Sequence, residues 1–182
     1  MKTWLDTTGE VLHWSYANLA MAHAAVSKRA ESYGRKHYAI RARLYKGLRT
    51  GTMNVGPLAD DERLKLTLPQ ACAYCGGRQH LAADHIVPRD RGGADEGDNL
   101  IWACRGCNSS KGNKDLLAWY ERRTEFPPLL ILRRYVKLAL EMCTVRGILD
   151  RPIVEAIDLP MEIGRVPQLF PPPGELKLWS GW

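Results

Sequence analysis

Hydrophobic residues recur every three or four positions in two long parts of the chain, and this spacing predicts amphipathic helices. The first part covers residues 11–48, where Gly34 and Gly47 are expected to act as breaks. It therefore predicts two helices. The second part covers residues 129–146 and is expected to end at Gly147.

A different pattern fills the middle of the chain. Residues 81–87 form a short apolar run between turn formers, and residues 99–103 follow as a second such run, so both predict strands. The glycine-rich residues 88–98 between them predict a loop. Residues 105–120 have helical character that only their two glycines, Gly106 and Gly112, interrupt. This order of strand, loop, strand and helix, set among helical flanks, predicts an α+β fold.

The 182 residues divide into three expected regions: a basic helical region at 1–66, a central core at 67–125, and a C-terminal helix with a proline-rich tail at 126–182. Residues 51–57 are expected to be a connector, and residues 58–68 lead into the core. The tail from residue 160 is expected to lack regular structure. It is also expected to pack on the body through its apolar residues, Leu176, Leu178, Trp179 and Trp182.

The chain has no run of 18 or more apolar residues, and residues 1–6 lack the basic start and apolar block of a secretory signal. We therefore expect a cytoplasmic protein with no membrane partner. Thiol pairs in that reducing compartment bind metal more often than they form disulfides.

Positive charge is concentrated near the amino terminus. The net charge is +6, and residues 28–49 hold eight Lys or Arg residues, three tyrosines and a single acid, Glu31. Such a segment is typical of a surface that binds phosphates, whereas a merely solvated helix face usually mixes both signs of charge. The candidate DNA contacts in this segment are Arg35, Lys36, Arg41, Arg43 and Lys46.

Four of the five cysteines occur as two Cys-x-x-Cys pairs, Cys72 with Cys75 and Cys104 with Cys107. Four thiolates can complete the tetrahedral shell of a structural zinc ion. The 28 residues between the pairs leave room for an inserted element. The fifth cysteine, Cys143, lies in an apolar helical stretch and is expected to be a small buried hydrophobe.

Other chemically distinctive residues occur in a fixed order around these pairs: Asp84-His85-Ile86-Val87-Pro88, Gly92-Gly93, Asp98-Asn99-Leu100, and Asn108 with Lys111 directly after the second pair. Together with the cysteines, this series resembles the zinc-containing HNH endonucleases, whose fold is a ββα-metal finger. The resemblance covers about residues 68–120. Asn108 stands where the last letter of the motif is His, an exchange that many family members show.

The resemblance implies a metal-dependent endonuclease that hydrolyses phosphodiester bonds of double-stranded DNA. His85 would be the general base, since an imidazole with a pKa near ~6.5 can take a proton from water at neutral pH. Asp84 and Asn108 would supply oxygen ligands to a catalytic Mg²⁺ or Mn²⁺. Asn99 would brace the loop and orient His85 through its backbone. Lys111, one helical turn after Asn108, is a candidate phosphate contact.

Several alternatives remain open at this point. Asp84 and His85 point to opposite sides of an ideal strand, so they can serve one site only if the strand ends or twists there. A zinc-ribbon module that binds nucleic acid without cutting it would need the four thiolates and the basic segment. The chain is also compatible with a nuclease subunit of a larger defence, packaging or recombination assembly. One copy of the motif suggests either a nickase or a homodimer.

Overall fold

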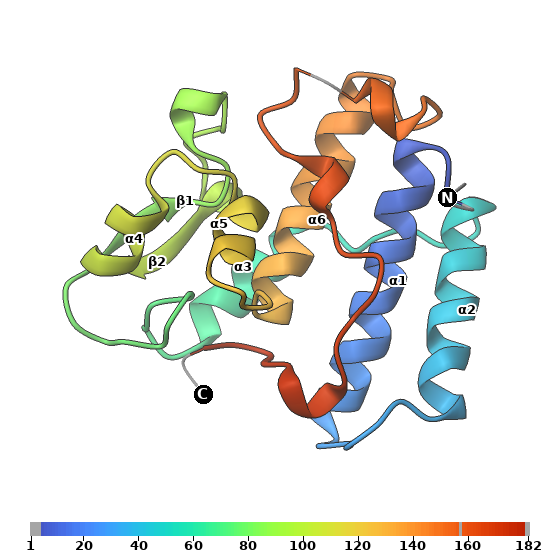
Figure 1. Cartoon of the computed structure of the whole chain (residues 1–182), viewed down its shortest axis with the longest axis horizontal. Coiled ribbons are helices and arrows are strands. Elements are labelled where there is room, and N and C mark those ends of the chain that lie inside the picture. Colours follow the sequence, from blue (N-terminus) through green and yellow to red (C-terminus); the bar gives the residue numbers. More distant parts are fainter. Residues whose placement is uncertain (1–4, 157, 181–182) are drawn as a thin grey trace.

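The computed structural model describes residues 5–156 and 158–180, so the predicted packing of Trp182 lies outside the described residues. Three long helices form a helical body: α1 (Thr8–Ser27), α2 (Arg35–Arg49) and α6 (Leu129–Val145). The helix α1 lies between the other two, and a smaller ββα unit occupies the opposite end of the molecule (Figure 1).

Local sequence signals explain where these helices begin. Thr7 and Glu10 form a capping box at the start of α1, because the Thr7 hydroxyl accepts from the Glu10 amide and the Glu10 carboxylate accepts from the Thr7 amide. Gly34 precedes α2 and confirms the first predicted break. The second predicted break is wrong. Gly47 lies inside α2, where an added Cβ would come within 2.6 Å of the Met53 side chain, so its role is close packing.

The ββα unit has the predicted order of strand, loop, strand and helix. Strand β1 (Leu81–His85) pairs antiparallel with β2 (Leu100–Cys104), and α4 (Arg105–Lys111) follows β2 directly. The register places His85 opposite Leu100. The helix ends at Gly112, as expected, but Gly106 lies inside it without breaking it. The unit and its flanking helices confirm the α+β fold class.

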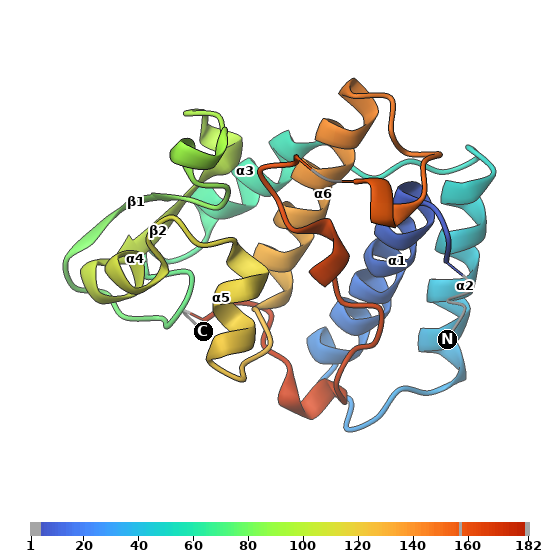
Figure 2. The ribbon, with the colours of Figure 1, turned by 45° about the horizontal axis from the view of Figure 1, so that its top comes forward.

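Two further helices connect the ββα unit to the body. Helix α5 (Leu116–Arg122) follows α4 after a short turn, and α3 (Leu58–Thr67) forms in a segment for which the sequence pattern predicts no element. Figure 2 shows α3, α5 and α6 between the ββα unit and α1. Side chains from the unit, α1, α6 and the tail belong to one buried hydrophobic cluster.

Buried ion pairs join α3 to α6. The Asp61 carboxylate accepts hydrogen bonds from Arg133 and Lys137, and its side chain is 4% exposed. Arg134 pairs with Glu62 and also donates to the backbone carbonyls of residues 97 and 98. Because these carbonyls lie just before β2, α6 fixes the position at which the loop re-enters the sheet.

Asp115 joins three more segments through one buried carboxylate. Its Oδ1 accepts from the amides of Leu117 and Ala118, which caps α5. Its Oδ2 accepts from the Tyr135 hydroxyl of α6 at 2.6 Å and from the Glu162 amide of the tail at 3.1 Å. Removing this carboxylate would leave buried donors on three segments without their partner.

The tail contains only short 3₁₀ turns among its described residues. Leu176 and Trp179 are buried and Leu178 packs against the core, so the predicted packing of the tail is confirmed for these residues. No helix among the described residues combines the length and apolar character that a membrane span requires.

Candidate metal centres and active site

The four paired cysteines lie together in space. Their sulfur atoms all fall within 4.8 Å of one another, and the Sγ atoms of Cys75 and Cys104 are 3.7 Å apart. Tetrahedral zinc with Zn–S bonds of about 2.3 Å requires sulfur atoms about 3.8 Å apart. The four thiols therefore suit a structural zinc ion.

The surrounding backbone shapes this cluster. The Ala73 amide donates to the Trp102 carbonyl at 2.8 Å, which joins the first cysteine pair to β2. Cys104 is both the last residue of β2 and the cap of α4, so the second pair spans the strand–helix junction. The two pairs thus clamp the base of the ββα unit.

The electrostatics of the cluster also favour a cation. The backbone N–H of Cys107 donates to the Cys104 sulfur and lowers the pKa of Cys104 to about 7. Burial and the neighbouring sulfur atoms raise the pKa of Cys107. Four thiolates at this spacing repel one another, so a divalent cation is needed to hold all of them deprotonated.

Asp84, His85 and Asn108 line one open hollow of about 310 Å³ between the sheet and α4. Strand β1 ends at His85, and the consecutive residues Asp84 and His85 both line the same hollow. The strand thus ends at the point where it must end or twist if Asp84 and His85 are to serve one site. Carboxylate and carboxamide oxygens are the ligands that Mg²⁺ prefers, and an imidazole beside them can accept a proton.

Asp84 is held by two partners. The Tyr74 hydroxyl donates to Asp84 Oδ2 at 2.6 Å, and the Lys111 ammonium donates to Oδ1 at 3.4 Å. Burial and the Asp84 charge raise the pKa of Tyr74 well above its ordinary value, so this hydroxyl remains a donor. A carboxylate offers about four lone-pair positions. These two hydrogen bonds leave lone pairs on the Asp84 carboxylate that a cation could bind.

Lys111 does not suit the predicted phosphate contact. Its side chain is 0% exposed, and its ammonium also donates to the His85 carbonyl at 2.6 Å. Burial lowers the pKa of Lys111, and the Asp84 carboxylate opposes that shift. The side chain instead links α4 to the end of β1. Sequence spacing places Lys111 on the same helix face as Asn108 but gives no information on its burial.

Asn99 is buried directly before β2 and braces the loop. Its Oδ1 accepts from the Val87 amide, and its Nδ2 donates to the carbonyls of Val87 and Ala94, each at 2.8 Å. The Asn99 carbonyl accepts from the Ile86 amide at 2.9 Å. One side chain therefore fixes the backbone just after His85 and the far side of the loop.

Two residues at the site, Tyr74 and Asp95, are not predicted from the sequence. Tyr74 lies within the first Cys-x-x-Cys pair, where a tyrosine carries no recognisable signal. Asp95 lies on the loop, and its carboxylate accepts from Nε2 of His85 at 2.8 Å. Its place shortly after Gly92 and Gly93 is the one signal that it lies near a turn.

Comparisons with known proteins find similarity in the same central segment. A family model described as HNH endonuclease matches residues 72–114. The central segment is an HNH endonuclease domain. The chain is also 42% identical over 52 residues to the CRISPR-associated endonuclease Cas9 of Corynebacterium diphtheriae. That match covers 26% of this chain and 5% of the relative. No solved structure matches the chain.

The basic helix α2 lies at the opposite end of the long axis from the HNH domain (Figures 1 and 2). Four of the predicted DNA contacts on α2 are exposed: Arg35, Lys36, Arg43 and Lys46. Arg41 instead turns inward. Its guanidinium lies 4.5 Å from the centre of the Trp14 ring and donates to Asn18 at 3.3 Å, so it holds α2 on α1.

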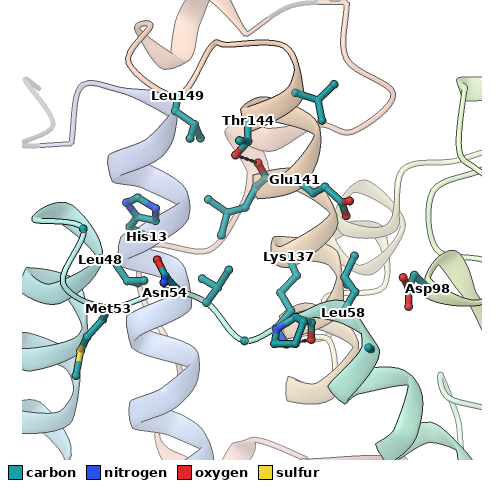
Figure 3. A pocket seen from close by; sticks show the side chains of 17 residues that line it. His13, Leu48, Met53, Asn54, Leu58, Asp98, Lys137, Glu141, Thr144 and Leu149 are labelled. Atoms are coloured by element: carbon teal, nitrogen blue, oxygen red, sulfur yellow. Dashed lines mark hydrogen bonds between the residues drawn. The ribbon is translucent and has the colours of Figure 1, made fainter.

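A second pocket, of about 570 Å³, lies between α1, the 51–57 connector and α6, and Asp98 of the HNH domain lies at its edge (Figure 3). One of its charged groups, Lys137, is already engaged. Lys137 donates to Asp61 and to the Pro57 carbonyl, and burial lowers the pKa of His13. Asp84, His85 and Asn108 do not line this pocket.

The sulfur cluster gives a direct prediction. The purified protein is expected to contain one zinc ion per chain, and Cys75→Ala is expected to lose both that metal and cooperative unfolding, because three thiols cannot complete the shell. Elemental analysis and thermal melts measure both properties. Cys143→Ala is the control, because Cys143 is buried in α6 away from the cluster. A well-folded, reduced wild-type protein without zinc would contradict the prediction.

Proposed function

We propose that this protein is a metal-dependent endonuclease that hydrolyses phosphodiester bonds of DNA. The observation that carries the proposal is the shared hollow of Asp84, His85 and Asn108 within an HNH domain. Phosphodiester hydrolysis needs a nucleophilic hydroxide and stabilisation of negative charge on the phosphate and the leaving oxygen. The three side chains offer groups suited to both needs.

His85 is the proposed general base, which takes a proton from the attacking water. Its side chain is 21% exposed and lines the hollow, so a water molecule can reach it. Asp84 and Asn108 are the proposed ligands of a catalytic Mg²⁺ or Mn²⁺. When bound, that cation would stabilise charge on the phosphate and on the leaving oxygen.

Lys111 and Tyr74 have supporting roles in this proposal. Lys111 is a buried cation next to the Asp84 carboxylate, and Tyr74 donates to the same group. Together they hold the carboxylate, which is only 7% exposed, in one orientation. Asn99 fixes the loop that follows His85.

The proposed substrate is double-stranded DNA, and the exposed basic residues of α2 are a proposed second contact with its phosphates. Because α2 and the HNH domain lie at opposite ends of the molecule, this contact would anchor DNA away from the scissile bond (Figure 1). A zinc module that binds nucleic acid without cutting it is the rival proposal, and assays of cleavage and binding by the same protein separate the two.

The catalytic assignment predicts a separation of cleavage from binding. His85→Ala is expected to lower cleavage of a labelled duplex in Mg²⁺ by about 10²- to 10⁴-fold, the range for a lost general base. Its zinc content and DNA affinity should stay near wild type. His23→Ala, an exposed histidine on α1, is the matched control. Equal cleavage by His85→Ala and wild type would refute the assignment.

The ligand assignment adds a metal dependence to the same assay. Asn108→Ala is expected to lose cleavage in Mg²⁺ and to regain part of it in Mn²⁺, which accepts poorer ligand sets. A loss of cleavage in Asp84→Ala is harder to assign to the catalytic cation, because this variant also leaves the buried Lys111 without its counter-charge. If the wild type binds DNA tightly but cuts it with no divalent cation, the rival proposal holds.

The helix α2 proposal predicts a change in binding alone. Reversing charge at Arg43 and Lys46 together should weaken affinity for all DNA sequences and reduce the salt slope by about 1 for each lost phosphate contact. Arg63→Glu, at an exposed position on α3, is the control. An unchanged affinity and salt slope in the α2 variant would show that this face is merely solvated.

A further inference from the structure

The side chain of Asp95, an acidic residue on the loop, touches the proposed general base. Its Oδ1 lies 2.8 Å from Nε2 of His85, and the two residues are ten positions apart on either side of the loop. We propose that Asp95 is a positioning residue for His85. This inference rests on the proposed function and deepens it.

The chemistry of the pair defines what Asp95 does. An ionised carboxylate can only accept hydrogen bonds, so Nε2 of His85 must carry the proton and donate it. A neutral imidazole has one protonated nitrogen. Holding the proton on Nε2 therefore leaves Nδ1 as the nitrogen that can take a proton from water. Asp95 selects the tautomer of the base and limits the rotation of its ring.

The loop brings Asp95 to this position through close backbone packing. Gly92 has a φ of +97°, and a Cβ on Gly93 would lie 1.9 Å from the Val87 carbonyl oxygen. The Gly93 amide donates to the Pro88 carbonyl at 3.0 Å. This part of the loop thus folds tightly against the residues that follow His85.

Asn99 completes the arrangement. Its Nδ2 donates to the Ala94 carbonyl, and the next residue is Asp95. The resemblance implies that Asn99 orients His85 through the backbone. The geometry adds a second route, in which Asn99 fixes Ala94, Ala94 places Asp95, and the Asp95 carboxylate holds the imidazole.

The Asp95–His85 pair affects the orientation of the His85 ring rather than the stability of the fold. The Asp95 side chain is 65% exposed, and ion pairs at such exposed positions contribute little to folding. The other carboxylate oxygen of Asp95, Oδ2, lies 3.7 Å from the Arg89 guanidinium. This ion pair limits the rotation of the Asp95 side chain. Removing Asp95 should therefore change the orientation of His85 while leaving the fold intact.

Two measurements on the zinc-loaded protein test this role. Nitrogen-15 NMR of the His85 ring, recorded without Mg²⁺, reports which nitrogen carries the proton. Steady-state cleavage of duplex DNA in Mg²⁺ separates kcat from KM. The variants are Asp95→Ala and Asp95→Asn, and the control is Glu96→Ala, which removes the same charge from the next residue.

Wild type should show the tautomer protonated at Nε2, and Asp95→Ala should show a mixture of tautomers. Its kcat should fall by about 10- to 100-fold with KM unchanged, by analogy with the loss of partners that orient metal-bound histidines. Asp95→Asn keeps an acceptor oxygen and should recover part of both properties. Glu96→Ala should match wild type in both.

Ring signals in Asp95→Ala that equal those of wild type would overturn the proposal, and so would a kcat within twofold of wild type. An Asp95→Asn protein as impaired as Asp95→Ala would assign the effect to the loop rather than to the hydrogen bond, which also overturns it. If the wild type cuts no DNA, the proposed function fails, and the NMR result alone still decides whether Asp95 sets the tautomer.

Discussion

Four sulfur atoms within 4.8 Å of one another set the geometry on which the rest of the site depends. The sheet has two strands of five residues each, and a two-stranded sheet of this size is at best marginally stable on its own. Metal coordination by Cys72, Cys75, Cys104 and Cys107 would join the two cysteine pairs at the base of this unit. It would thereby fix β1, which carries Asp84 and His85, relative to α4, which carries Asn108.

The helical body stabilises the opposite side of the unit. Arg134 of α6 donates to two carbonyls just before β2, and Asp115 joins α5, α6 and the tail through one carboxylate. Polar groups buried in this way are costly to leave unpaired, so they favour one relative placement of the segments. The loop with Asp95 is thus held at its end by the body and in its middle by Asn99.

The parts of this protein that depend on local chemistry can be predicted from the sequence. The cysteine spacing and the order of strand, loop, strand and helix follow from thiols, glycines and short apolar runs, and the structure shows both. The role of Gly47 could not be predicted, because it depends on the packing of Met53 against α2. The inward turn of Arg41 and the burial of Lys111 likewise depend on tertiary partners, Trp14 and Asp84. The contact between Asp95 and His85 likewise depends on how the loop folds.

The central claim is that one short segment holds two metals with different tasks. Anomalous diffraction from crystals of the protein with duplex DNA and Mn²⁺, recorded at the zinc and manganese edges, tests it most directly. The account predicts a zinc peak among the four cysteine sulfurs and a manganese peak in contact with Asp84 and Asn108. Manganese bound elsewhere, with a DNA phosphate in the hollow and no metal at Asp84, would contradict it.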